Sequence, residues 1–126
     1  MKILLLLCIP FFTIQTNSTK TSISALSIKK DAKKLAEYYR LRVIRGESMS
    51  SIAKLYSEDP GSASNGGQYN HVVKGMMVPE FEKVAFSLKP NEISEVFETS
   101  YGFHFIQLIS IKGAVLDLRH VLIMKE

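Results

Sequence analysis

Two segments near the C-terminal end of this 126-residue chain constrain its fold more than any other feature. Residues 103–111 are dense in β-formers, and residues 116–124 alternate apolar side chains with Asp117 and Arg119. The short link Lys112-Gly113-Ala114 could turn the chain between them. In a β-strand, successive side chains point to opposite faces, so an alternation of apolar and polar residues is typical of a strand. Both segments are therefore predicted to be β-strands.

Upstream of these segments, the apolar residues recur at the spacing that is typical of helices. Apolar side chains recur at spacings of three and four over residues 32–43, while Lys and Arg fill the opposite face, which predicts a helix. Ser48 is placed to begin a second short helix, and Pro79 suits the first position of a third. Short strands are expected at 68–73 and 93–99. Because helices are mixed with antiparallel strands, the predicted fold class is α+β.

The first residues form a segment of their own. Lys2 precedes a run of uncharged, mostly apolar residues that is too short to cross a bilayer as a helix. We interpret residues 1–16 as a signal peptide and residues 17–27 as a linker. This interpretation implies a secreted or periplasmic protein, with no stable membrane insertion after the signal is removed. The alternative is that the apolar run is a buried first strand.

Composition argues against several classes of function. The single cysteine, Cys8, allows neither an intrachain disulfide nor a thiolate metal cluster. Lys and Arg exceed Asp and Glu by 16 to 12 and are spread along the chain, so no nucleic-acid partner is expected. His71, His104 and His120 lack the spacing of metal ligands. We therefore expect no metal and no cofactor.

An ordered set of short motifs extends over residues 46–111. The set comprises Gly46-Glu47-Ser48-Met49, Ile52-Ala53-Lys54-Leu55-Tyr56-Ser57-Glu58-Asp59-Pro60-Gly61-Ser62, Gly66-Gly67, Lys74-Gly75-Met76-Met77-Val78-Pro79-Glu80-Phe81-Glu82, Ala85-Phe86, Glu92-Ile93-Ser94 and Thr99-Ser100-Tyr101-Gly102-Phe103-His104-Phe105-Ile106. In this order it resembles the parvulin, or PpiC-type, family of peptidyl-prolyl cis-trans isomerases, which occurs in periplasmic foldases and outer-membrane-protein chaperones. The resemblance implies a parvulin-like domain over residues 28–112. Its fold would be an FKBP-like, antiparallel four-stranded sheet with surrounding helices.

The resemblance implies four substrate-binding side chains. Met77 and Phe81 match the floor of the family's proline pocket, although their periodicity alone is equally typical of ordinary core positions. Tyr69 occupies a pocket position where the family usually has Leu, so the pocket could be narrower or carry a hydroxyl at its edge. Tyr101 is the fourth of these residues.

Four further side chains match catalytic positions of the family. Asp59 matches a loop position that is Cys or Asp in active members; the alternative is a solvated loop carboxylate that bonds the following turn. His104 matches a strand histidine that the family pairs with a second histidine, and its alternative role is that of a hydrogen-bonded core histidine. Thr99 matches a hydroxyl in the same network, and His120 would supply the second histidine.

The largest departure from the family is at the front of the chain. Parvulins usually begin with a strand that carries the second histidine, and residues 15–30 contain no histidine and no such strand. Residues 117–123 resemble that strand at the other end of the chain. Residues 113–126 therefore either fold back as a strand that completes the sheet, which brings His120 beside His104, or open a following domain.

Two functions from different classes follow from the resemblance. The first is a peptidyl-prolyl cis-trans isomerase that assists the folding of secreted or periplasmic proteins. The second is a non-catalytic chaperone domain that binds peptides in the same pocket. Both have proline-containing unfolded or extended polypeptides as partners. The change to Tyr69 and the displaced histidine favour the binding domain, whereas the set of matching site residues favours the enzyme.

Overall fold

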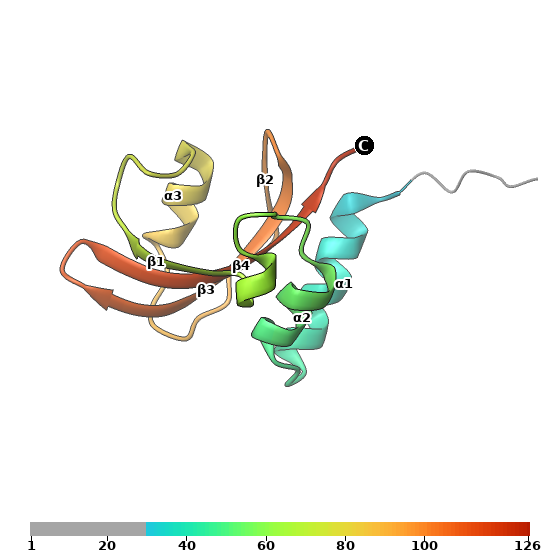
Figure 1. Cartoon of the computed structure of the whole chain (residues 1–126), viewed down its shortest axis with the longest axis horizontal. Helices are drawn as coiled ribbons and strands as arrows, with labels where there is room; N and C mark the ends of the chain where they lie inside the picture. Colours follow the sequence, from blue (N-terminus) through green and yellow to red (C-terminus); the bar gives the residue numbers. More distant parts are fainter. Residues whose placement is uncertain (1–29) are drawn as a thin grey trace, which may run out of the picture.

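The strands form one antiparallel sheet in the order β1–β4–β3–β2 (Figure 1). The computed structural model describes residues 30–126. The helical elements are α1 (Ala32–Ile44), α2 (Met49–Tyr56), the 3₁₀ turn η1 (Ala63–Asn65) and α3 (Pro79–Ala85). The strands are β1 (Gln68–Val72), β2 (Phe97–Thr99), β3 (Gly102–Lys112) and β4 (Val115–Met124). The predicted α+β class with a four-stranded antiparallel sheet is confirmed.

The predicted signal peptide (residues 1–16) and linker (17–27) lie outside the described residues. Over residues 30–126, no helix combines the length and the apolar character needed to cross a membrane. The interpretation of the N-terminal segment therefore stays a prediction.

The helices begin where the sequence predicts. The side chain of Asp31 accepts a hydrogen bond from the backbone N–H of Lys34 at the start of α1, at 3.0 Å. Ser48 caps α2 by accepting from the N–H of Ser51 at 3.3 Å. Pro79 occupies the first turn of α3, where its missing N–H leaves no hydrogen bond unmade.

The strand predicted at 93–99 is shorter than expected. Only Phe97–Thr99 forms β2, and Ile93 makes an isolated bridge with Gln107. The cause is Ser94, whose hydroxyl oxygen accepts the hydrogen bond from the N–H of Ile106 at 2.9 Å. A side chain thus takes the place of a backbone carbonyl in the ladder, and regular pairing resumes only at Phe97.

The strand β4 lies in the interior of the sheet. It pairs with β3 over the register from Gly102↔Met124 to Lys112↔Val115, and its other edge pairs with β1. Gly113, with φ of +59°, reverses the chain between β3 and β4. Residues 115–124 therefore adopt the fold-back arrangement in this structure. Gly67 allows the close approach of β1, because a Cβ there would overlap the carbonyl oxygen of His120.

The two faces of the sheet carry separate hydrophobic clusters. Side chains of α1 and α2 pack against one face around Phe105, Val121 and Ile123. Side chains of α3 pack against the other face around Ile106 and Leu118. Because successive side chains of a strand point to opposite faces, β3 and β4 contribute to both clusters. His104 and His120 are on the α3 face, in phase with Ile106 and Leu118.

Removal of residues 115–126 should abolish cooperative unfolding. The deletion takes the fully buried Leu116 and Leu118 from one cluster, removes Val121 from the other, and removes the strand with which β1 pairs. At about 2–5 kcal/mol for each large apolar side chain lost, the combined loss is as large as the roughly 5–15 kcal/mol by which domains are usually stable. Thermal circular dichroism of the truncated chain tests this, with a chain lacking only the exposed Lys125 and Glu126 as the control. An unchanged midpoint in the longer truncation would contradict the prediction.

Candidate functional site

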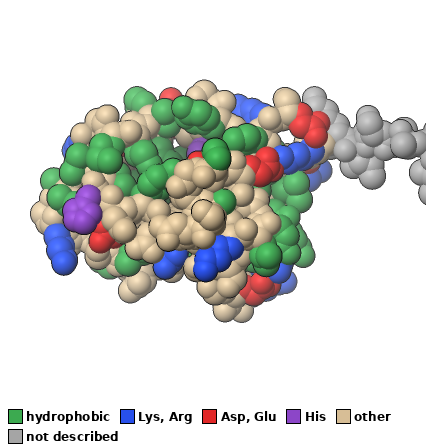
Figure 2. Space-filling view, viewed as in Figure 1, with side chains coloured by type: hydrophobic (Ala, Val, Ile, Leu, Met, Phe, Trp, Pro, Cys, Tyr) green, Lys and Arg blue, Asp and Glu red, His purple; other side chains and the backbone are tan. Residues whose placement is uncertain are grey.

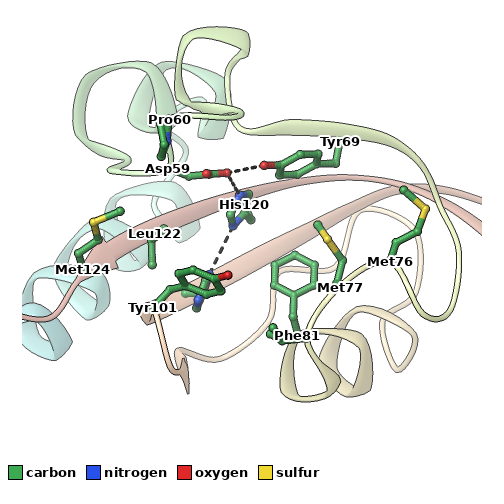
Figure 3. Close-up of a pocket in the computed structure, with 12 residues that line it drawn as sticks. Asp59, Pro60, Tyr69, Met76, Met77, Phe81, Tyr101, His120, Leu122 and Met124 are labelled. Carbon is green, nitrogen blue, oxygen red and sulfur yellow. Dashed lines mark hydrogen bonds and ion pairs between the residues drawn. The ribbon is translucent and has the colours of Figure 1, made fainter.

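A cavity of about 360 Å³ opens between the loop that precedes η1, the strand β1, the start of α3 and the strands β3 and β4. Seven of the eight predicted site residues line it (Figure 3): Asp59, Tyr69, Met77, Phe81, Tyr101, His104 and His120. The eighth, Thr99, is buried and hydrogen-bonded to His104. In a space-filling view of one face, hydrophobic side chains gather on the surface and a small area of histidine is visible among them (Figure 2).

One end of the cavity is apolar. Phe81 is buried and stands edge-on to both imidazoles, with ring centroids 5.8 Å from His104 and 5.4 Å from His120. The carboxylate of Glu82 accepts hydrogen bonds from the N–H groups of Gly75 and Met77, at 2.5 and 3.2 Å. These bonds tie the turn before α3 to the helix, so Met77 is held beside Phe81 (Figure 3).

The polar wall is a chain of hydrogen-bonding groups. Thr99 Oγ1 is 2.6 Å from His104 Nε2, and His104 Nδ1 is 3.5 Å from His120 Nδ1. His120 Nε2 is in turn 2.7 Å from Asp59 Oδ2. The register of β3 and β4 pairs His120 with Ile106, so His104 and His120 are diagonal neighbours on one face. Their rings are stacked, 5.7 Å apart.

The Asp59 carboxylate is held by several donors. Its Oδ2 atom accepts from Ser62 Oγ at 2.6 Å and from Tyr69 Oη at 2.7 Å, in addition to His120. Its Oδ1 atom accepts from the N–H of Gly61 at 3.2 Å. The hydrogen bond from His120, followed by those from Ser62 and Tyr69, outweighs burial and holds the pKa of Asp59 well below its usual range. Asp59 is therefore ionised at neutral pH.

His104 is neutral at pH 7. Its side chain is 4% exposed, and burial lowers its pKa to about 4, with a smaller contribution from His120 in the same direction. The charge of Asp59 opposes this shift without reversing it. The site thus combines a fixed negative charge with an uncharged imidazole.

The protonation states of Asp59 and His104 determine which ring nitrogens of the two histidines carry a hydrogen. Because ionised Asp59 can only accept, His120 must donate from Nε2. When both rings are neutral, His120 Nδ1 is then an acceptor for His104 Nδ1–H, and His104 Nε2 accepts from the hydroxyl of Thr99. In that state every hydrogen bond in the chain points from Thr99 toward Asp59.

Several residues of the site were not predicted as functional. Ser62 is fully buried and bonds both Asp59 and His120 Nε2, the latter at 3.0 Å. Leu122 and Met124 line the cavity, as their positions two and four residues after His120 on one strand could have indicated. Pro60, Met76 and Val78 complete the lining. Ser62 had no such signal, because its position depends on the loop around Asp59.

The cavity is suited to an apolar ring beside a polar group. Of the residues described, none of those lining the cavity is Lys or Arg. Among residues 30–126, no group of His, Cys, Asp and Glu side chains is arranged to hold a metal ion. The arrangement can bind an uncharged ring against Phe81 and place the polar atoms next to it beside Asp59 and the imidazoles.

Acidification should destabilise the protein through His104. Because the pKa of His104 is lower in the folded state than the unfolded value near 6.5, the unfolded chain binds more protons as the pH falls below 6.5. The free energy of unfolding should drop by about 2 to 3 kcal/mol between pH 6.5 and 4.5 from this group. Urea unfolding at each pH measures this free energy, and His104→Asn should reduce the slope of the free energy of unfolding against pH.

The exposed His71 provides the matched control for this experiment. His71 has φ of +57°, a conformation that Asn tolerates, so His71→Asn should keep the wild-type pH dependence. Equal slopes in the two variants would show that His104 is not the group responsible.

Comparisons with known proteins place the chain in one family. The model of the rotamase family, described as the PPIC-type PPIase domain, matches residues 14–110. The foldase protein PrsA of Geobacillus kaustophilus is 43% identical over 89 residues, which are 71% of this chain and 32% of that protein. The chaperone SurA of Pseudomonas savastanoi is 40% identical over 86 residues, 68% of this chain and 20% of that protein.

A solved structure is also similar. The crystal structure of the peptidylprolyl isomerase PrsA from Bacillus cereus has a TM-score of 0.62 and 39% identity, covering 65% of this chain and 32% of that one. The chain thus spans a third or less of the length of these relatives. Since the family model matches most of the chain, this protein belongs to the PpiC-type peptidyl-prolyl cis-trans isomerase family, the parvulins.

Proposed function

We propose that this chain catalyses cis-trans isomerisation of X–Pro bonds in unfolded or extended polypeptides. The observation that carries the proposal is the cavity itself. An apolar floor of Met77 and Phe81 lies directly against the chain of groups from Thr99 to Asp59. Family membership and the relatives named as foldase and chaperone support the same reading.

The reaction explains why such a site needs neither a nucleophile nor a metal. Rotation about the peptide bond is opposed by conjugation, with a barrier of roughly 18–20 kcal/mol, and no covalent bond breaks. A site lowers this barrier if it binds the twisted amide better than the planar one. Exclusion of water from the dipolar planar amide acts in the same direction.

Seven of the eight predicted residues have a role in this proposal. Met77 and Phe81 hold the proline ring. Asp59, with His104, Thr99 and His120 behind it, presents a fixed charge whose field acts on the rotating amide. Tyr101, which is 60% exposed, covers the cavity from the rim.

The proposed setting is outside the cytoplasm. The similarity to PrsA and SurA, together with the signal peptide predicted over residues 1–16, supports this location. We propose that residues 28–112 and the strand within 113–126 act as one parvulin domain, because β4 supplies His120 to the site. Proline-containing polypeptides are the proposed partners.

A peptide-binding chaperone without turnover is the second candidate. One observation favours it: three donors already occupy Oδ2 of Asp59, which leaves that oxygen committed to the protein. Such a domain would bind proline segments in the same cavity and leave their isomerisation rate unchanged.

Asp59→Asn should lower kcat/KM for X–Pro peptides by at least about tenfold, because the change removes the fixed charge while keeping the side-chain shape. The assay follows isomerisation of a panel of short X–Pro peptides. Glu47→Gln is the matched control, since it converts an exposed carboxylate paired with Arg42 to an amide outside the cavity.

Three results separate the candidates. Loss of rate in Asp59→Asn but not in Glu47→Gln supports the isomerase. Peptide binding by the wild-type chain without any rate enhancement supports the chaperone. A wild-type rate in Asp59→Asn would remove Asp59 from the mechanism.

A further inference from the structure

We propose that Tyr69 is a positioning residue for the isomerase: its hydroxyl fixes the Asp59 carboxylate against His120, and Gly61 provides the space in which that hydroxyl lies. This inference rests on the proposed function and deepens it. It gives Tyr69 a second role beyond that of a pocket wall.

The sheet register brings Tyr69 to the polar wall. Tyr69 of β1 pairs with Leu118 of β4, and His120 lies two residues further along β4 on the same face. The phenol ring therefore lies next to the imidazole, with centroids 5.3 Å apart. From there Tyr69 reaches across His120 toward Asp59 (Figure 3).

The direction of the hydrogen bond is settled by chemistry. An ionised carboxylate has no hydrogen to donate, so the single hydroxyl hydrogen of Tyr69 goes to Asp59 Oδ2 at 2.7 Å. Burial and the neighbouring Asp59 raise the pKa of Tyr69 to about 12, so the phenol keeps this hydrogen at any physiological pH. A leucine, which the family usually has here, could fill the wall but could not donate.

Gly61 is the second, independent observation. A Cβ at this position would lie 2.8 Å from Tyr69 Oη, closer than such atoms normally approach. Gly61 is not among the residues with positive φ, so its backbone conformation does not itself require glycine. What glycine provides at position 61 is therefore room for the hydroxyl. The same glycine donates its N–H to Asp59 Oδ1.

Together these contacts fix Asp59 on three sides. The groups that face its carboxylate are His120 from β4, Tyr69 from β1 and the neutral Ser62, with His104 behind His120. Without the phenol, the carboxylate would keep Ser62 and His120 but could rotate toward the open cavity. The alignment of His120 with His104 would then be less strictly held.

The test is a double-mutant cycle of Tyr69→Phe and Gly61→Ala, measured as kcat and KM for an X–Pro peptide. Tyr69→Phe keeps the ring and removes the donor, so kcat should fall about tenfold while KM stays within about twofold. Gly61→Ala displaces the hydroxyl and should cause a similar fall. In the Tyr69→Phe background, Gly61→Ala should cost nothing further, because the obstructed atom is gone. Tyr38→Phe, on the exposed face of α1, is the matched control.

A measurement independent of activity uses nuclear magnetic resonance. The Asp59 carboxyl carbon should titrate at higher pH in Tyr69→Phe and in Gly61→Ala than in the wild type, because one donor to the ionised form is lost. The ring nitrogens of His120 should shift in the same two variants. Tyr38→Phe should leave both signals unchanged.

The outcomes distinguish this inference from the proposed function. If the wild-type chain has no isomerase activity, the proposed function fails, and the nuclear magnetic resonance signals still decide whether Tyr69 positions Asp59. If Tyr69→Phe retains wild-type kcat and leaves the Asp59 titration unchanged, Tyr69 is only a wall of the pocket and the inference is wrong. Additive losses in the double variant would equally overturn the role assigned to Gly61.

Discussion

The pairing of β4 with strands on both of its edges is the interaction on which the rest of the structure depends. Because β4 joins β1 to β3, it connects the two hydrophobic clusters, contributing Val121 and Ile123 to one and Leu116 and Leu118 to the other. The same strand carries His120 between Asp59 and His104. Stability of the sheet and geometry of the site are therefore set by one register.

Much of this could be predicted from the sequence, because it follows from local periodicity. The alternation around His104 and His120 places both on one face, and Ser48 and Pro79 mark the starts of helices. The rest depends on contacts that no local pattern encodes. The hydroxyl of Ser94 replaces a backbone acceptor and shortens the predicted strand, and Ser62 reaches the site only through the loop geometry around Asp59.

Tyr69 illustrates the limit of reading a pocket position by residue type. The sequence indicated either a narrower pocket or a hydroxyl at its edge, and the structure shows that this hydroxyl donates its hydrogen bond to Asp59. The consequence is a site in which polar groups are satisfied by one another. The side chains most exposed to a bound peptide are then the apolar ones, Met76 and Tyr101 among them.

The position of β4 also has a consequence for the order in which the fold can form during synthesis. His120 is 61 residues beyond Asp59, and among residues 30–126 the strand that pairs with β1 is β4. When synthesis has reached only the end of β3, the two halves of the cavity wall have been made but are not yet joined by β4. The β3–β4 hairpin joins them, so the non-local pairing of β1 with β4 is expected to limit the rate of folding.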